Sequence, residues 1–214
     1  MQNIKYILFD AANTLIHKPS LWPSIQSVLS KYGFILPEEK LKLHHKLLSE
    51  VINFPDRTSE EFYHYFNAEL LLSLGILPNE KILKDFFTAC SYLPWECFND
   101  TEWLNTCALP IGVLSNFNKG LPDILQKLFG NIFSDIIVSE SLEIRKPDVA
   151  VYQHALDVIG LPANQILYVG DSLKLDVLPS RSIAFNTHLI DRLDIYTEFK
   201  NRLSFLDELN SIIQ

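Results

Sequence analysis

The fold of this chain is decided by one stretch near its start, YILFDAANTL at residues 6–15. An apolar run extends from Ile4 to Phe9, and Asp10, two small residues, an amide and a hydroxyl follow directly. A short apolar run closed by turn residues is typical of a strand that is buried on both faces of a parallel sheet. In such sheets the reactive groups lie just past the carboxyl ends of the strands. We therefore expect Asp10 to be a nucleophile or a metal ligand, unless it only caps the following turn.

Length and composition describe an ordinary globular protein with an acidic charge balance. The chain has 214 residues, of which 48% are hydrophobic and 21% charged, and its net charge is −8. This charge argues against sequence-independent binding of nucleic acid or anionic lipid, which needs a basic face. No apolar stretch approaches the ~18 residues of a membrane span, and the N-terminus lacks the layout of a signal peptide. Because the three cysteines have no metal-type spacing, we expect reduced core thiols and a cytoplasmic protein.

Residues 17–105 differ from the rest of the chain because helical patterns dominate them. Pro37 begins one pattern, with two carboxylates in its first turn. Residues 58–61 have the form of a capping box, and a further helix is expected from residue 79 or 80 to about residue 92. This segment shows no convincing strand pattern. We predict that it is a helical domain inserted after the first strand.

Strand and helix patterns alternate through the remaining chain. Apolar runs predict strands at residues 110–116, 133–138, 165–169 and 183–190, and helical spacing predicts helices between them and near the C-terminus. Alternation of this kind implies a doubly wound parallel sheet with right-handed crossovers. We therefore predict an α/β core, formed by residues 1–16 and 106–214, that carries the helical domain as an insertion.

Polar side chains follow four of the predicted strands. In chain order they are Asp10 with Thr14, Ser115 with Asn116, Lys146 before Pro147, and Asp171 with Asp176. In these motifs the chain resembles the haloacid dehalogenase superfamily of hydrolases. That family has Asp-x-Asp-x-Thr after the first strand, a Ser or Thr after the second, a Lys commonly followed by Pro, and a Gly-Asp-x-x-x-x-Asp set. The order is the same here, and the helical insertion lies between the first two motifs, as in the subgroup whose lid lies there. The resemblance covers essentially the whole chain and implies a Rossmann-like core with a helical cap.

The resemblance implies a magnesium-dependent phosphatase that acts on a small phosphorylated metabolite. Asp10 would be the nucleophile and would form an aspartyl-phosphate, while Lys146 and Ser115 would hold the phosphoryl oxygens. The implied Mg²⁺ ligands are Asp10, the main-chain carbonyl of Ala12, and Asp171.

Four further residues complete the implied site. Asp176 belongs to the metal site as a group that orients Asp171. Asn116, Thr14 and His17 are the candidate substrate-binding residues, although Thr14 is expected to fix the loop geometry rather than take part in chemistry. Each also has an ordinary structural interpretation when it is taken alone. Asn116 could cap the loop after a strand, and Asp176 could be a carboxylate at a helix N-terminus.

Position 12 departs from the family pattern. Ala12 stands where the family's phosphatases have the second Asp, which protonates the leaving oxygen and later deprotonates water. A positioned general acid–base typically contributes about 10²–10⁴-fold, so its loss would damage an enzyme without abolishing the reaction. Asn13 also replaces the usual Gly, and Asn tolerates unusual backbone angles better than most residues.

Three explanations of Ala12 stay open. In the first, the chain hydrolyses esters with good leaving groups, or borrows an acid such as His17, His44 or His45. In the second, it performs family chemistry that needs no such acid. The phosphonoacetaldehyde hydrolases have Ala at this position and use a cap lysine, and the 2-haloacid dehalogenases work without a metal. In the third, the chain is a degenerate member that binds a phosphorylated ligand or a protein partner without turnover. The retained Gly-Asp-x-x-x-x-Asp set favours a metal-dependent reaction.

Overall fold

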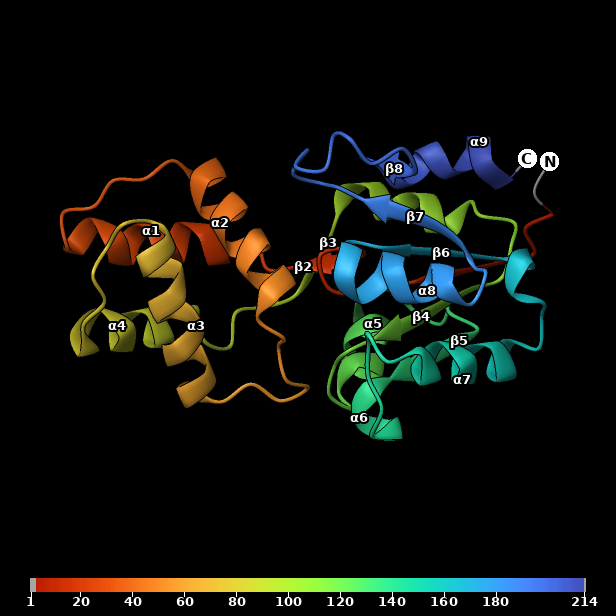
Figure 1. The fold of residues 1–214 in the computed structure, drawn as a ribbon, viewed down its shortest axis with the longest axis horizontal. Coiled ribbons are helices and arrows are strands. Elements are labelled where there is room, and N and C mark those ends of the chain that lie inside the picture. Colours follow the sequence, from red (N-terminus) through yellow and green to blue (C-terminus); the bar gives the residue numbers. More distant parts are fainter. Residues whose placement is uncertain (1–2, 214) are drawn as a thin grey trace. The chain divides into compact units, whose positions relative to one another are not determined.

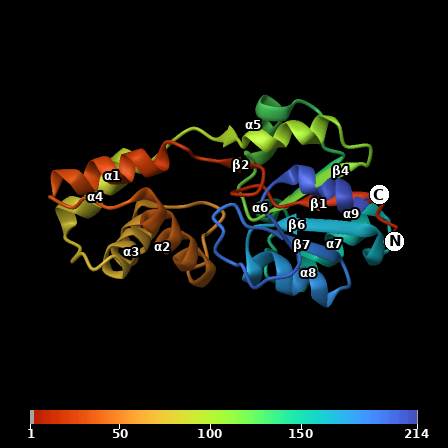
Figure 2. The same ribbon diagram turned by 90° about the horizontal axis from the view of Figure 1, so that it is seen from above.

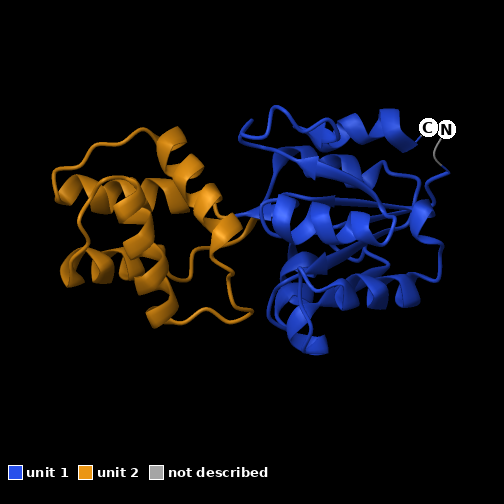
Figure 3. Ribbon diagram, in the orientation of Figure 1, with its two compact units in different colours: residues 1–17, 97–214 blue, residues 18–96 orange. Residues whose placement is uncertain are grey.

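The computed structural model describes residues 3–213, and the chain forms two compact units (Figure 3). Unit 1 contains the chain up to His17 and from Cys97 onward, and unit 2 contains Lys18–Glu96. The predicted insertion extends to residue 105, whereas unit 2 ends at Glu96. Each unit has a hydrophobic core of its own, so each is described by itself.

The sheet of unit 1 has six parallel strands in the order β5-β4-β1-β6-β7-β8 (Figure 1). The strands are β1 (Tyr6–Phe9), β4 (Ile111–Ser115), β5 (Asp135–Val138), β6 (Ile166–Gly170), β7 (Asn186–Ile190) and β8 (Arg202–Leu203). The first strand lies in the interior of the sheet, where Phe9 pairs with Val113 on one side and with Val169 on the other. All four residues of β1 are buried, as the apolar run predicts. The predicted α/β class with a parallel sheet is therefore confirmed.

Helices cover both faces of this sheet. They are α5 (Leu121–Phe129), α6 (Ser139–Leu142), α7 (Val149–Ile159), α8 (Leu178–Ser182) and α9 (Asn210–Ile213). Shorter 3₁₀ or π turns are η1 (Asn99–Asn105), η2 (Ala163–Gln165), η3 (Leu173–Val177) and η4 (Leu206–Leu209). Figure 2 shows α5 on one side of the sheet and α7 and α8 on the other. Under α7, the rings of Tyr152, Tyr168 and Phe185 pack against one another. These rings pack α7 against strand β6.

The start of the last long strand in unit 1 differs from the sequence prediction. The last long strand begins at Asn186 rather than at residue 183. Ala184 has a φ of 68° and its amide donates to the carbonyl of Arg181, so the chain is still turning there. Phe185 is apolar because it packs in the core and not because it extends the strand. The apolar run therefore predicted burial correctly but the start of the strand wrongly.

Residues 97–105 belong to unit 1 because side chains tie them to its C-terminal part. The indole of Trp103 donates a 2.9 Å hydrogen bond to Asn210. Asp100 pairs with Arg192 at 2.9 Å and accepts a 2.8 Å bond from the amide of Leu206. These contacts join segments that are distant in the sequence, so no local pattern in residues 97–105 could reveal them.

Unit 2 is a group of four helices around an apolar core. They are α1 (Leu21–Lys31), α2 (Glu38–Val51), α3 (Glu60–Ser73) and α4 (Glu80–Cys90). Ser59 accepts a hydrogen bond from the amide of Phe62, and Asn79 accepts from the amide of Ile82, so both predicted N-termini are capped. Two short strands, β2 (Ile16–His17) and β3 (Glu96–Cys97), form a separate two-stranded sheet.

The structure bears on two sequence predictions, the lack of a membrane span and the state of the three cysteines. Within residues 3–213, every helix is too short or too polar to cross a membrane. Cys90, Cys97 and Cys107 are free thiols. Cys97 is exposed, so the prediction of a core thiol is wrong at that position, while the other two are half-buried.

Candidate active site

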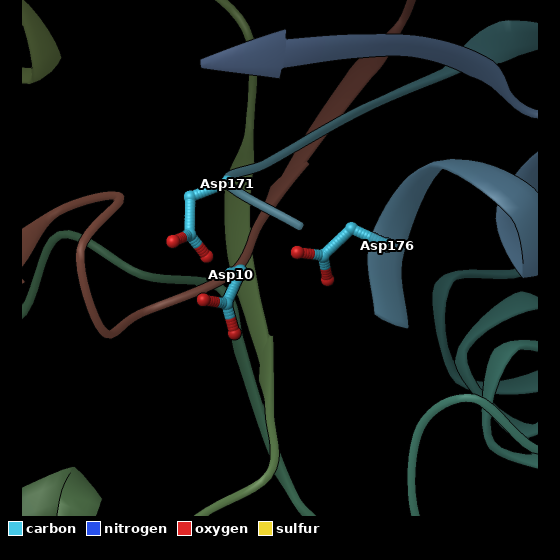
Figure 4. A group of neighbouring side chains, drawn as sticks. All are labelled: Asp10, Asp171 and Asp176. Carbon is cyan, nitrogen blue, oxygen red and sulfur yellow. The ribbon is translucent and has the colours of Figure 1, made fainter. Parts of the chain in front are cut away.

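Three carboxylates meet at the carboxyl end of the central strands. Asp10 directly follows β1, and Asp171 directly follows the adjacent β6. The amide of Asp10 donates a 2.8 Å bond to the carbonyl of Val169, which holds the two strand ends together. Figure 4 shows the carboxylates of Asp10 and Asp171 beside each other, with Asp176 directed toward them from η3. One oxygen from each of the three lies within 4.8 Å of the others.

Lys146 lies among these carboxylates. Its Nζ donates hydrogen bonds of 2.6 Å to Asp10 and 2.6 Å to Asp176, and a longer one of 3.2 Å to the hydroxyl of Tyr168. Its side chain is only 3% exposed. Burial by itself lowers the pKa of Lys146, but Asp10 and Asp176 outweigh it and raise the pKa above the usual value. The ammonium is therefore charged at neutral pH and compensates part of the buried negative charge.

Asp10 is a buried carboxyl group whose pKa lies well above its ordinary value. Its pKa is raised from 3.8 to about 7: burial is the largest cause, Asp176 and Asp171 add to the rise, and Lys146 opposes it. Three carboxylates and one ammonium leave two negative charges when all are ionised. A divalent cation beside Asp10 would neutralise them and lower this pKa. The site thus has the charge deficit and the oxygen donors that a cation requires.

Asp176 is held rigidly by its neighbours. Its Oδ2 accepts a 2.9 Å bond from the amide of Ser172, and its Oδ1 accepts a 2.8 Å bond from the hydroxyl of Tyr168. A Cβ atom at Gly170 would collide with the carboxyl group of Asp176. The glycine of the Gly-Asp-x-x-x-x-Asp set is therefore explained by this close approach.

The loop after β1 is closed by its own main chain. The carbonyl of Ala11 accepts the amides of Thr14, Leu15 and Ile16 at 3.3, 2.9 and 3.0 Å. Asn13 donates a 2.7 Å bond to the carbonyl of Ile16, and its φ is 60°. Because Asn adopts this left-handed conformation more readily than most residues, it serves where the family has Gly. Position 12 lies inside this loop and carries only a methyl group.

Ser115 and Asn116 end the neighbouring strand β4. Ser115 is its last residue and is 2% exposed. The side-chain amide of Asn116 donates a 2.8 Å bond to the carbonyl of Lys146, and its oxygen accepts a 2.8 Å bond from the amide of Lys146. Asn116 therefore fixes the main chain that carries Lys146, and its predicted role in substrate binding stays a prediction.

Thr14 and His17 occupy the loop and its exit. Thr14 is fully buried, and its Oγ1 has no hydrogen-bond partner among the described residues. The ring of His17 stacks on Phe98, with 4.0 Å between the ring centroids and 13° between the planes. Both remain candidate substrate-binding residues.

Sequence reasoning missed two residues around this site. Tyr168 bonds both Lys146 and Asp176, and Arg192 bonds the carbonyl of Thr14. Tyr168 lies in an apolar strand, where a tyrosine is indistinguishable from a packing residue. Its only sequence signal is its place two residues before Gly170. Arg192 follows the last long strand and has no motif around it.

Comparison with known proteins gives a consistent result. Residues 4–182 match the haloacid dehalogenase-like hydrolase family. Haloacid dehalogenase-like hydrolase domain-containing protein 3 of Danio rerio is 36% identical over 137 residues, which cover 58% of this chain and 56% of the relative. The chain spans about half of the length, or less, of this Danio rerio relative and of its counterparts in Xenopus laevis and Homo sapiens.

A second relative and a solved structure match over most of their length. A phosphoglycolate phosphatase of Neisseria gonorrhoeae is 25% identical over 195 residues, which cover 85% of this chain and 78% of the relative. The putative HAD-hydrolase YfnB from Bacillus subtilis, in a magnesium-bound crystal structure, has a TM-score of 0.70 at 16% identity and covers 99% of both chains. The structural likeness establishes the shared fold.

Proposed function

The chain belongs to the haloacid dehalogenase-like hydrolases, and on that premise we propose that it is a magnesium-dependent phosphatase of a small phosphorylated metabolite. The observation that carries the proposal is the group of Asp10, Asp171 and Asp176, in which the ammonium of Lys146 bonds the two buried carboxylates, Asp10 and Asp176. The phosphoglycolate phosphatase relative and the magnesium-bound structural neighbour support the same class of reaction.

The donor set of the site suits magnesium. Mg²⁺ prefers oxygen ligands and usually binds through one or two carboxylates beside phosphate and water. The three carboxylates each bring one oxygen within 4.8 Å of the others, so oxygen donors are already gathered at this site. We assign Asp10, Asp171 and the carbonyl of Ala12 as ligands. Asp176 orients them, because its hydrogen bonds already commit both of its oxygens.

In the proposed reaction, Asp10 attacks phosphorus in line with the ester bond. A bond forms between a carboxylate oxygen and phosphorus, the bond from phosphorus to the ester oxygen breaks, and the leaving oxygen takes the electron pair. Water then opens the aspartyl-phosphate, releases inorganic phosphate and a proton, and restores the carboxylate. Magnesium, when bound, would supply positive charge beside the phosphoryl oxygens. Lys146 supplies a second positive charge and holds Asp10 at 2.6 Å, and Ser115 would donate a hydrogen bond to a phosphoryl oxygen.

The methyl group of Ala12 narrows the substrate class. It has no proton to give, so the leaving oxygen departs as an anion unless another group protonates it. Acyl phosphates, phosphoanhydrides and aryl phosphates release stabilised anions, whereas alkyl phosphates release an alkoxide. We therefore place the substrate among the acyl phosphates, phosphoanhydrides and aryl phosphates.

A phosphatase screen tests this proposal. The panel contains acetyl phosphate, pyrophosphate, p-nitrophenyl phosphate and glycerol phosphate, each with Mg²⁺ and with EDTA. We expect turnover of the first three that chelation abolishes and that Asp10→Asn lowers by about 10⁴-fold or more. Asp148→Asn is the matched control, because this exposed carboxylate caps α7 and an amide oxygen can still accept the bond from Ala150. Turnover that survives Asp10→Asn would remove Asp10 from the role of nucleophile.

Ala12 also favours a second candidate, a protein that binds a phosphorylated ligand without turnover. Calorimetric titration with Mg²⁺ and inorganic phosphate separates the two. Tight binding of both, with no hydrolysis of any compound in the panel, selects the second candidate. Phosphonoacetaldehyde and a 2-haloacid extend the panel to the family's two other reactions, and borohydride trapping of a lysine adduct would identify the phosphonoacetaldehyde reaction.

A further inference from the structure

Arg192 is fastened to the loop that follows Asp10. Its Nη2 and Nε donate hydrogen bonds of 2.7 and 3.2 Å to the carbonyl of Thr14. Inside the loop, three amides converge on the carbonyl of Ala11, so those bonds shape the loop but do not attach it to its surroundings. The carbonyl of Thr14, in contrast, is bonded to a segment far along the chain.

The guanidinium of Arg192 is itself held from another side. Its Nη1 donates a 2.9 Å hydrogen bond to Oδ2 of Asp100, and the same oxygen accepts a 2.8 Å bond from the amide of Leu206. The side chains of Arg192 and Asp100 are only 11% and 13% exposed. An arginine that is this little exposed and donates hydrogen bonds to two partners has little freedom to move.

A stack of planar groups adds to these hydrogen bonds. We call the four residues involved, Arg192, Asp100, Phe98 and His17, the clasp. The guanidinium carbon of Arg192 lies 3.9 Å from the ring centroid of Phe98, and the ring of His17 lies 4.0 Å from the same centroid. Two planar groups at these distances from one ring occupy its opposite faces. His17 is the last residue of unit 1 before the chain enters unit 2, and Phe98 is the second residue after it returns. The clasp thus includes both crossing points of the chain.

The positive charge of Arg192 also interacts electrostatically with Asp171. Burial lowers its pKa, whereas Asp100 and Asp171 oppose this change. An arginine keeps its proton in proteins, so a permanent positive charge lies near Asp171.

We propose that Arg192 is a positioning residue for the hydrolytic reaction: through the carbonyl of Thr14 it fixes the loop whose first residue is the nucleophile Asp10. This inference rests on the proposed function for its kinetic consequence, but its structural part stands independently. A misplacement of the nucleophile by about 1 Å can cost about 10²-fold in rate. Release of the loop is therefore expected to lower kcat and to leave KM nearly unchanged, because Arg192 is assigned no contact with the substrate.

The test compares Arg192→Ala and Arg192→Lys with the control Arg202→Ala. Arg202 is a partly buried arginine of the same unit that pairs with Asp191 and Asp194 and is bonded to no residue of the loop. We expect Arg192→Ala to lower kcat on acetyl phosphate by about 10- to 100-fold, with KM changed less than about twofold. Added methylguanidinium is expected to recover at least a tenth of the lost kcat in Arg192→Ala only. Arg192→Lys keeps the charge but not the bidentate geometry, so it is expected to stay below a tenth of the wild-type kcat.

Hydrogen exchange supplies a measurement that is independent of turnover. The amides of residues 13–16 are expected to exchange at least tenfold faster in Arg192→Ala than in the wild type, and at the wild-type rate in Arg202→Ala. Unchanged exchange in this loop would overturn the proposal, as would full activity of Arg192→Lys. If the wild type hydrolyses nothing while the loop amides respond as expected, the proposed function fails and the clasp stands.

Discussion

The two units bury different chemistry. The core of unit 2 is aliphatic and aromatic; among the described residues of this unit Asn67 is the one buried polar residue, and His45 is half-buried. Unit 1 buries Asp10, Lys146 and Asp176 at the carboxyl end of its central strands, together with several hydroxyl side chains. Burial of a charge costs free energy that its partners repay only in part. The difference indicates that unit 1 keeps a destabilising group where the proposed reaction needs it, whereas the core of unit 2 contributes mainly apolar packing.

A large-to-small substitution in unit 2 is the strongest test of this contrast. Phe86 is 1% exposed in the apolar core, so Phe86→Ala is expected to lower the unfolding free energy of unit 2 by about 3–5 kcal/mol. Leu72→Ala is the control, because Leu72 is 48% exposed on α3 and its truncation should cost about 0.5 kcal/mol or less. Urea unfolding followed by circular dichroism measures both. Equal losses in the two variants would show that unit 2 has no packed core of the kind described.

The pH dependence of stability is expected to have opposite signs in the two units. In unit 1, burial raises the pKa of Asp10 to about 7, so the folded state binds the extra proton between about pH 4 and pH 7. The unfolding free energy contributed by Asp10 therefore falls as pH rises through this window. In unit 2, burial lowers the pKa of His45 to about 4, so the unfolded state binds the extra proton between about pH 4 and pH 6.5. The contribution of His45 therefore rises with pH.

Two variants separate these contributions. Without metal, Asp10→Asn removes the falling component, and His45→Gln removes the rising one, each by a few kcal/mol across its window (about 1.4 kcal/mol per pKa unit). Denaturant unfolding at intervals from pH 4 to pH 8 in EDTA measures the slopes. Mg²⁺ is expected to stabilise the wild type more at pH 8 than at pH 5, because the cation favours the ionised form of Asp10. A slope that Asp10→Asn leaves unchanged would contradict the assignment of this carboxyl group.

The same contrast explains how much the sequence could reveal. Strand β1 and Asp10 were predictable because a buried parallel strand must be an apolar run and must end in a turn. The capped helices at Ser59 and Asn79 were predictable for a similar reason, since a helix start is a local signal. Local patterns of this kind exist throughout both units.

Contacts between distant segments left no such signal. Tyr168 looks like any strand residue, and its bonds to Lys146 and Asp176 depend on how strand β6, the segment before α7 and the turn η3 come together. Arg192 meets Asp100 across a long stretch of chain, so neither residue predicts the other. For this reason the sequence indicated the carboxylates and Lys146, but not Tyr168, which bonds Lys146 and Asp176, or Arg192, which bonds the loop after Asp10.

The smallest expected effect concerns the acidic side chain that position 12 lacks. Ala12→Asp supplies a proton donor and is expected to raise the hydrolysis of glycerol phosphate about 10²-fold, which corresponds to about 2.7 kcal/mol of barrier. Acetyl phosphate is expected to respond less than about threefold, because its leaving group departs as a stable anion without a proton. Ala12→Asn is the control of equal size that cannot act as an acid.

The ratio of kcat/KM for the two substrates is the measurement, since it cancels any change in the amount of active protein. A parallel rise for both substrates would mean that the new carboxylate acts on the metal or the loop and not on the leaving oxygen. A fourth carboxylate also adds negative charge beside Asp10, so a gain in rate despite that cost would identify proton transfer as the step that limits alkyl esters.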